Sequence, residues 1–414
     1  MNNSFSHVNI KLALAFILTS FLGLVASQFI LFWNSEWLIH GYFRIPSLWM
    51  AFHLLILGFA VMVVMGAMYQ MIPVVLLTPI WNERFGFYQY IITISGILIL
   101  SIQLGLKPSI AFYGGAITII GILMFLFQMY LTIKAQKQKN RITGLVVGGA
   151  LTFLFLTIIA GFLLAWNIGN GGEILRHESI FSSHLLFGLT GWFTLLIIGF
   201  SYKLVPMFSL AHGFSMRWIK KAYFIYLLGM FFLILSFWMN DSTLSQIGWL
   251  LLWIGFTLFL LDIREMLAKR LRRQLDRSFR FALMAIYFGS VIHFLAFIVS
   301  LMKANAVIWG GVLIYLYIMT WIIFSILGYL KKIVPVLWWT LKYDKKIGKE
   351  QVPALKDLIN EKNDIIIYCS FLIGIVGTVI AFLTENILLM QFFQGLLFVS
   401  IVLYGITIIQ ILRK

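Results

Sequence analysis

Twelve apolar segments, each about long enough to cross a lipid bilayer, constrain this chain more than any other feature. An α-helix needs about 20 mostly apolar residues to span the hydrocarbon core. Because 62% of the residues are hydrophobic and only 11% are charged, a soluble domain of this length could not cover its apolar surface. The sequence therefore predicts an all-α membrane protein with twelve transmembrane helices. The segments lie at approximately 9–33, 48–76, 87–106, 109–133, 143–168, 180–208, 220–240, 244–267, 279–302, 306–338, 364–384 and 386–412.

The positive charges are distributed unevenly between the two predicted sides of the membrane. If both termini are cytoplasmic, all but four of the 31 Lys and Arg residues fall on the inner side. The four outer residues are Arg44, Lys107, Arg176 and Lys303. This asymmetry follows the positive-inside rule and predicts a multi-pass protein of the plasma membrane with cytoplasmic N- and C-termini. The net charge of +17 then reflects topology and attraction to the lipid bilayer, and we expect no nucleic-acid partner.

A short motif recurs near the inner ends of three long apolar segments. In each copy a Gly stands seven residues before a proline, and the three prolines are Pro73, Pro206 and Pro335. A Tyr or Lys lies four residues before the proline, at Tyr69, Tyr202 and Lys331. The repeat distance is about the length of four membrane crossings with their loops. It predicts one transmembrane domain, 1–414, built from three pseudo-symmetric four-helix arcs at about 9–133, 143–267 and 279–412.

Charged residues are scarce inside the predicted membrane segments. All 14 Asp and Glu residues fall in loops or at helix ends, so the sequence offers no mid-membrane carboxylate for proton transport. Lys203, Lys331 and Lys332 lie near inner helix ends, where we expect their side chains to extend to the headgroups. The single cysteine, Cys369, excludes an internal disulfide and a cysteine-built metal site.

Three histidines lie within apolar segments: His53, His184 and His293. The predicted topology places all three in the outer half of the membrane. Neutral imidazole is the commonest nitrogen ligand for haem iron, copper and zinc. We therefore interpret His53, His184 and His293 as cofactor-binding candidates, and His53 and His184 as metal ligands. The alternative, that each is a hydrogen-bonding residue of the helix core, stays open.

The three four-helix units, with a His at the outer start of the second and sixth helices, resemble the catalytic subunit of the haem-copper oxidase superfamily. That family includes cytochrome oxidases and nitric oxide reductases. The motifs GxxYQxxP and GxxYKxxP also look like those of small membrane proteins related to this subunit. The resemblance implies that His53 ligates a low-spin haem. This sequence departs from the family on the tenth helix, where Leu313 and Tyr315 replace His-x-His, and on the sixth, where Leu185 follows His184.

Three membrane imidazoles are fewer than the four that a binuclear haem-copper centre needs. The resemblance therefore implies a haem-binding integral membrane protein with one b-type haem, for electron transfer or binding of nitric oxide or oxygen, rather than proton-pumping oxygen reduction. His53 would be one axial ligand, and His293, His184, Tyr315 or Met319 would be candidates for the opposite one. Any enzyme activity would be that of an oxidoreductase of this type, with a small redox or assembly partner.

Two other functions remain open from the sequence. The first is a redox-inactive transporter or oxidase-assembly accessory protein, in which bulky side chains or a wet cavity would replace the cofactor. The second is a copper-handling protein that uses His53, His184 and nearby methionines. Those methionines recur at three-residue steps, which also fits ordinary packing along one helix face. They are Met50, Met62, Met65, Met68 and Met71.

Overall fold

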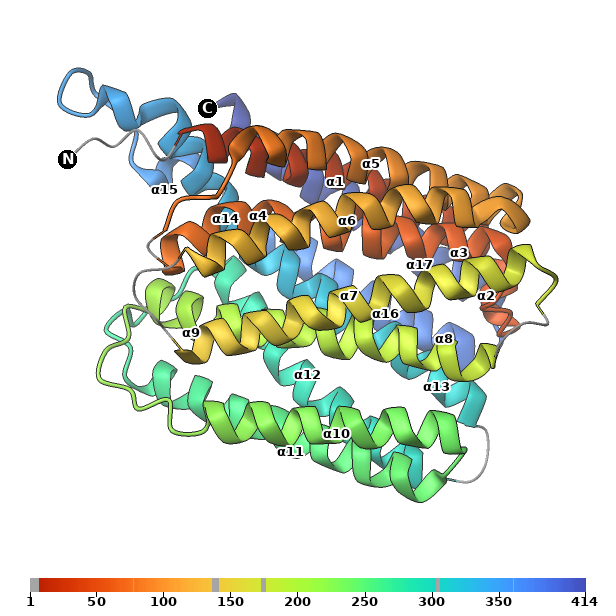
Figure 1. Ribbon diagram of the computed structural model, residues 1–414. Coiled ribbons are helices and arrows are strands. Elements are labelled where there is room, and N and C mark those ends of the chain that lie inside the picture. The colour runs from red at the N-terminus through yellow and green to blue at the C-terminus, as the bar shows by residue number, and fades with distance from the viewer. Residues whose placement is uncertain (1–6, 77, 136–140, 173–175, 303–305, 360) are drawn as a thin grey trace. The chain divides into compact units, whose positions relative to one another are not determined.

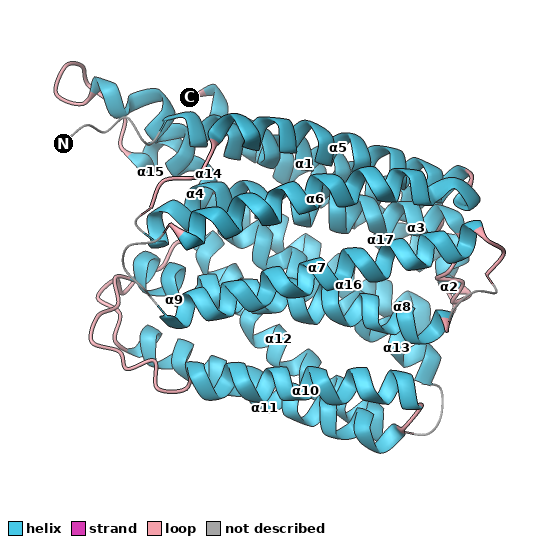
Figure 2. Cartoon of the chain, viewed as in Figure 1, coloured by secondary structure: helices cyan, strands magenta, loops and turns pink. Residues whose placement is uncertain are grey.

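The computed structural model describes residues 7–76, 78–135, 141–172, 176–302, 306–359 and 361–414. Within these residues the chain is helical (Figure 2), and the only extended pairing is one isolated bridge between Ala211 and Arg270. The described residues contain 12 helices long and apolar enough to cross a membrane. The predicted all-α class and the number of spans are therefore confirmed. Lys303, one of the four predicted outer charges, lies outside the described residues.

Close contacts group the chain into two compact units, Met1–Gln138 with Ile326–Lys414, and Lys139–Ser325. We call these the terminal unit and the central unit. The three four-helix arcs inferred from the sequence stay a prediction. The terminal unit contains α1 (His7–Trp33), α2 (Ser35–Ile39), α3 (Pro46–His53), η1 (Leu54–Val61), α4 (Met62–Leu76), α5 (Glu83–Leu106), η2 (Pro108–Ile110), α6 (Ala111–Lys134), most of α14 (Phe324–Tyr343), η5 (Asp344–Lys346), α15 (Leu355–Leu358), α16 (Asp364–Leu383) and α17 (Ile387–Arg413). The central unit contains α7 (Arg141–Gly169), α8 (His177–Leu185), η3 (Leu186–Thr194), α9 (Leu195–Ser209), α10 (Ile219–Met239), α11 (Ser242–Ala268), α12 (Arg277–Leu301), α13 (Ala306–Leu316) and η4 (Tyr317–Ile323).

Glycines set the close approach of neighbouring helices in the terminal unit. A Cβ on Gly23 of α1 would lie 2.7 Å from the carbonyl carbon of Gly58 in η1. One on Gly96 of α5 would lie 2.5 Å from the backbone nitrogen of Thr118 in α6. These contacts bring backbones together without intervening side chains, as small residues do at membrane helix interfaces. The start of α1 and the end of α17 lie at the same end of this unit (Figure 1).

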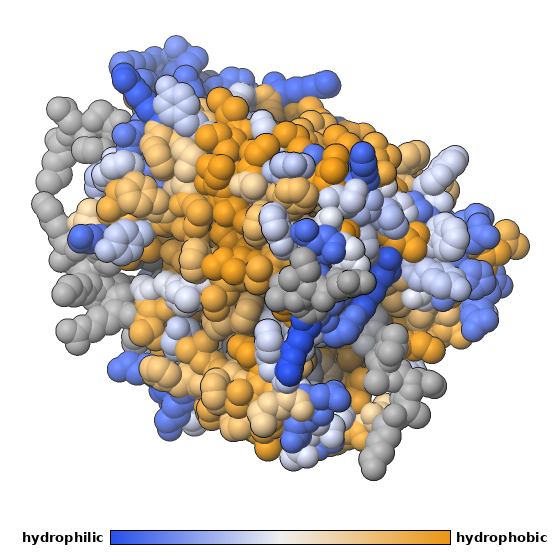
Figure 3. Space-filling view, turned by 45° about the vertical axis from the view of Figure 1, so that its right-hand side comes forward, coloured by the Kyte–Doolittle hydropathy of each residue, from blue (hydrophilic) through white to orange (hydrophobic). Residues whose placement is uncertain are grey.

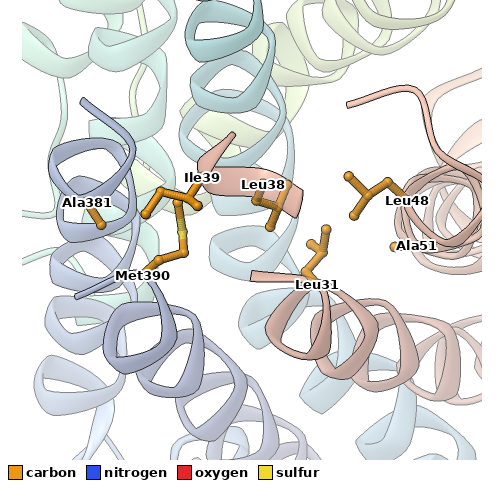
Figure 4. Close-up of a cluster of buried hydrophobic side chains, with 7 residues drawn as sticks. All are labelled: Leu31, Leu38, Ile39, Leu48, Ala51, Ala381 and Met390. Carbon is orange, nitrogen blue, oxygen red and sulfur yellow. The ribbon is translucent and has the colours of Figure 1, made fainter. Parts of the chain in front are cut away.

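At the opposite end of the terminal unit, apolar side chains from five helices form one cluster (Figure 4). It joins α1, the short α2, α3, α16 and α17 just before the position of His53. Burial of these side chains fixes the N-terminal end of α3, because each fully buried aliphatic side chain contributes roughly 1.5–3 kcal/mol. The members are Leu31, Leu38, Ile39, Leu48, Ala51, Ala381 and Met390.

In the central unit, α10 and α11 form an antiparallel hairpin and lie side by side (Figure 1). Asn240 ends α10 in the left-handed conformation with φ of 54°, which Asn tolerates better than most residues. Asp241 then caps α11, because its side chain accepts hydrogen bonds from the backbone nitrogens of Thr243 and Leu244.

Many exposed side chains on the helices of both units are large and apolar, and apolar residues cover broad parts of the face in Figure 3. Such surfaces suit contact with lipid.

Each of the three repeat helices contains a π-helical segment at an equivalent place. The segments η1, η3 and η4 end at Val61, Thr194 and Ile323, twelve residues before the repeat prolines in all three copies. π-helices are rare and often mark functional sites. The repeat seen in the sequence motif therefore extends into the backbone geometry, which the sequence did not predict.

The residue four positions before each repeat proline makes a buried polar contact with another helix. Tyr69 donates to Gln89 Oε1 at 3.0 Å, and Tyr202 donates to Asp262 Oδ2 at 2.8 Å. Lys331 pairs with Asp364 Oδ1 at 2.5 Å. We call these three contacts the inner latches. The Lys331 side chain is only 2% exposed, so the expectation that it reaches the headgroups is wrong, because Asp364 satisfies its charge inside the protein.

Candidate functional site

His53 is the last residue of α3 and stands directly before the π-helix η1. Its Nδ1–H donates to the carbonyl oxygen of Trp49 at 2.8 Å. This bond fixes the tautomer, so that Nε2 carries the lone pair. Among the described residues no hydrogen-bond partner occupies Nε2, and the side chain is half-buried. A histidine held in this way through Nδ1 has the orientation seen in metal-ligating histidines.

Gln28 on α1 is a buried polar group at the same level of the terminal unit. Its side chain is fully buried, and neither the amide nitrogen nor the oxygen has a hydrogen-bond partner among the described residues. The antiparallel register of α1, in which Gly23 opposes Gly58, places residue 28 level with His53. An unsatisfied buried amide costs about 1–3 kcal/mol. Gln28 therefore favours a bound polar group or water at its own place on α1.

His184 is the second-last residue of α8 and stands two residues before the start of the π-helix η3. Its Nδ1–H donates to the carbonyl oxygen of Thr157 at 3.0 Å. The ring packs on Gly161 of α7, where a Cβ would lie 2.9 Å from His184 Cε1. The imidazole thus joins α7 to α8 across a glycine contact, which is also what a hydrogen-bonding core histidine does.

His293 on α12 is completely buried and uses both ring nitrogens. Nδ1–H donates to the carbonyl oxygen of Gly289 at 2.6 Å, and Nε2 accepts from the hydroxyl of Tyr226 at 3.1 Å. Phe256 stacks on the ring with a centroid distance of 4.6 Å. The same ring packs closely on α12, because a Cβ added at Gly289 would lie 2.5 Å from Phe256 Cζ. This packing leaves no room for a porphyrin at Nε2.

Tyr317, rather than Tyr315, is the helix residue that meets His293. Tyr317 is the first residue of η4, and its hydroxyl lies 3.4 Å from His293 Nε2. It also lies 2.6 Å from Thr194 Oγ1. Tyr315 precedes it by two residues on α13 and is half-buried.

Thr194 organises the hydrogen bonds around Tyr317. Its hydroxyl donates to the carbonyl oxygen of Leu189, five residues earlier, at 3.0 Å. The oxygen then accepts from Trp321 Nε1 at 3.0 Å and from the hydroxyl of Tyr317 at 2.6 Å. Sequence reasoning did not select Tyr226 or Thr194. Each has a hydroxyl in the middle of an apolar segment of the sequence. Such a hydroxyl needs a buried hydrogen-bond partner, and this feature could have marked both residues.

The predicted site residues fall into two groups. His53 belongs to the terminal unit, whereas His184, His293 and Tyr315 belong to the central unit. Within the central unit, His184 and His293 have different hydrogen-bond partners, Thr157 for the first and Tyr226 for the second. In the described part of the chain, no group of three or more His, Cys, Asp or Glu side chains could hold a metal ion.

Comparison of the sequence with models of protein families and with curated proteins finds no match. The function must therefore be argued from the residues themselves. Among the described residues, His53 and Gln28 of the terminal unit and the Tyr226–His293–Tyr317 cluster of the central unit are polar side chains that offer chemistry within the membrane segments.

Proposed function

We propose that this protein binds one b-type haem through His53 and serves in electron transfer or in binding nitric oxide or oxygen. The observation that carries the proposal is the open Nε2 of His53, whose ring is oriented through Nδ1 by the Trp49 carbonyl. Haem iron accepts such an imidazole as an axial ligand. This function agrees with the resemblance to the haem-copper oxidase catalytic subunit, except that the protein would hold one cofactor, the haem.

Gln28 supports a polar ligand at this place. Its amide has no hydrogen-bond partner among the described residues and lies at the level of His53. The Gln28 amide would donate a hydrogen bond to a polar haem substituent, and His53 would hold the iron. The bound haem would supply one-electron chemistry or a gas-binding position. His53 and Gln28 would orient it and keep it within the apolar part of the helices.

The buried carboxylates argue against proton pumping as part of this function. Asp262 and Asp364 are both buried. Each is held by an inner latch, Asp262 by Tyr202 and Asp364 by Lys331. A carboxylate that transfers protons through a membrane needs access to water or to another relay group. The latches give Asp262 and Asp364 a structural role instead.

Absorption spectra of the purified protein test the haem proposal. We expect protein from cells supplied with a haem precursor to show a Soret band, and His53→Ala to lower its intensity per chain at least about tenfold, because an axial ligand is lost. His40→Ala is the control, since His40 is exposed in the loop after α2 and its loss should leave the band unchanged. A Soret band of full intensity in His53→Ala would sink the ligand assignment.

One observation favours the alternative of a redox-inactive accessory protein. Aromatic side chains fill the space around His293, with Phe256, Tyr226 and Tyr317 all buried. A wild-type protein that contains no haem under the same conditions would support this alternative. The copper-handling alternative gains less support, because Met65 and Met68 are fully buried and the Met65 sulfur accepts from Gln89 Nε2 at 3.7 Å. The methionines therefore fit packing.

A further inference from the structure

Three side-chain atoms of the central unit form a small triangle inside the membrane segments. The Tyr226 hydroxyl lies 3.1 Å from His293 Nε2, the Tyr317 hydroxyl lies 3.4 Å from the same nitrogen, and the two hydroxyls are 3.5 Å apart. The three residues come from α10, α12 and η4. All three side chains are buried, with exposed fractions of 1%, 0% and 5% in the order Tyr226, His293 and Tyr317.

Hydrogen bonding accounts for only part of this geometry. A hydroxyl donor prefers an acceptor at about 2.5–3.0 Å, and the Tyr317 hydroxyl already has such a partner in Thr194 at 2.6 Å. The two sides of the triangle at 3.4 and 3.5 Å are too long to be good hydrogen bonds. The Tyr226 hydroxyl donates to His293 Nε2 at 3.1 Å, so one side of the triangle is a hydrogen bond and the other two sides hold polar atoms close together without a good one.

The triangle has the size that a tetrahedral metal ion requires. Ligand atoms bound to an ion at about 2.0–2.1 Å with tetrahedral angles lie roughly 3.3–3.4 Å apart. The three measured distances bracket this value. Imidazole nitrogen and phenolate oxygen both coordinate first-row transition metals. Three protein ligands are also the number that catalytic zinc sites use.

The surroundings also fit an ion-binding site. His293 Nδ1–H donates to the Gly289 carbonyl, which leaves the Nε2 lone pair directed to the triangle. Thr194 accepts from the Tyr317 hydroxyl and is itself fixed by Leu189 and Trp321. The Gly289 contact is of the kind that orients a metal-ligating histidine. When Tyr317 loses its proton to the ion, the Thr194 hydroxyl would turn from Leu189 and donate to the phenolate oxygen. A histidine and two tyrosines are thus oriented before any ion binds.

Charge selects the kind of ion. Two phenolates and a neutral imidazole around a divalent ion give a site with no net charge, which limits the cost of burial in an apolar medium. Copper(II) binds nitrogen and oxygen donors most strongly among the divalent first-row metals. We propose that Tyr226, His293 and Tyr317 form a binding site for a divalent transition-metal ion, and by this order of affinities copper(II) is the ion that binds most tightly. This site is separate from the proposed haem ligand His53.

Ion binding needs no oxidation or reduction, because released protons balance the charge of the ion. The ion replaces the hydroxyl protons of Tyr226 and Tyr317, so that two protons leave for each ion bound. The other polar groups facing the triangle are Thr190 and Thr194 of η3 and Trp321 of η4, with Phe256 of α11 over the imidazole. None of these four ionises at ordinary pH. While both tyrosines are protonated in the metal-free protein, the apparent affinity for the ion should therefore rise about 100-fold for each unit increase in pH.

Copper titration of the full-length protein tests the proposal. The protein is purified in detergent, stripped with a chelator and titrated with copper(II) sulfate. We expect one tightly held copper per chain, a visible phenolate-to-copper charge-transfer band and an electron paramagnetic resonance spectrum with one histidine nitrogen. Release of two protons per copper is an independent readout.

Variants assign the ligands. Tyr226→Phe and Tyr317→Phe should each weaken copper binding at least about tenfold and lower proton release to one per copper. Tyr223→Phe is the matched control, because Tyr223 lies one turn earlier on α10 and its hydroxyl is 3.4 Å from the Leu145 carbonyl. Tyr223→Phe should bind copper like the wild type, and so should His53→Ala, whatever its haem content.

Three results would overturn the site. They are a wild-type protein that retains no copper, bound copper without the charge-transfer band, and equal affinity in Tyr317→Phe and Tyr223→Phe. The triangle would then be a hydrogen-bonded packing cluster only. Elution volume and thermal unfolding show whether each variant is folded, and the wild-type spectra decide the question if the ligand variants are not.

Discussion

Lys331 and Asp364 form an ion pair in which both side chains are almost completely buried. The lysine nitrogen also lies 5.9 Å from the centre of the Tyr404 ring. An ion pair of this kind offsets the large cost of moving two charges out of water, and either charge left alone is strongly unfavourable. Single residues of the inner latches should therefore dominate local stability.

Removing one partner of this pair tests its role. We expect Lys331→Met to lower the free energy of unfolding by about 3–5 kcal/mol, because Asp364 remains buried without its partner. The double variant Lys331→Met with Asp364→Leu should recover much of that loss. Denaturant unfolding of the purified protein measures both values. Lys332→Met, one residue further and half-exposed, is the control, and an equal loss there would contradict the argument.

The elements of this protein are joined by glycine contacts and shaped by π-helical segments. The three π segments lie at equivalent places in the three repeat helices. In two of them the segment follows a histidine within two residues, at His53 and His184. A π turn widens the helix by one residue and redirects the side chains beside it. His53 stands directly before one of these segments, and Tyr317 is the first residue of another.

Replacing each of two glycines by alanine distinguishes the effect of helix packing on stability from the effect of helix propensity. A Cβ on Gly23 would clash with the η1 backbone at 2.7 Å, whereas nothing lies within 4 Å of a Cβ on Gly148 in α7. Gly148→Ala should raise stability by up to about 1 kcal/mol through helix propensity. Gly23→Ala should lower it by about 1–3 kcal/mol through overpacking. Thermal unfolding measures both, and the same sign for both variants would refute the packing argument.

At the scale of the whole molecule, the described part of the chain forms twelve membrane-length helices, and the charge pattern predicts which side each loop faces. The placement of the Lys and Arg residues predicts an orientation with both termini inside. It determines whether His53 lies near the outer or the inner surface, because α3 begins at the end where α1 finishes.

Reporter fusions test this orientation. Green fluorescent protein fused after Lys414 should fluoresce, since it folds on the cytoplasmic side. Alkaline phosphatase fused after Gly171, an exposed residue in the turn after α7, should be active, because it needs the outer side. The reverse pattern would contradict the positive-inside assignment and would move His53 to the inner half of the membrane.

The sequence by itself determined the membrane class, the twelve spans, the internal repeat and the choice of His53 as a candidate. These depend on local composition and on spacing along one helix, which a sequence shows directly. It could not determine the π segments. Whether a backbone N–H bonds to the carbonyl four residues earlier, as in an α-helix, or five residues earlier, as in a π-helix, depends on packing against neighbouring helices. Only the tertiary structure paired Lys331 with Asp364 and brought Tyr226, His293 and Tyr317 together. Those contacts join helices far apart in the chain, and no local pattern records which buried hydroxyl, amine or imidazole will meet which partner.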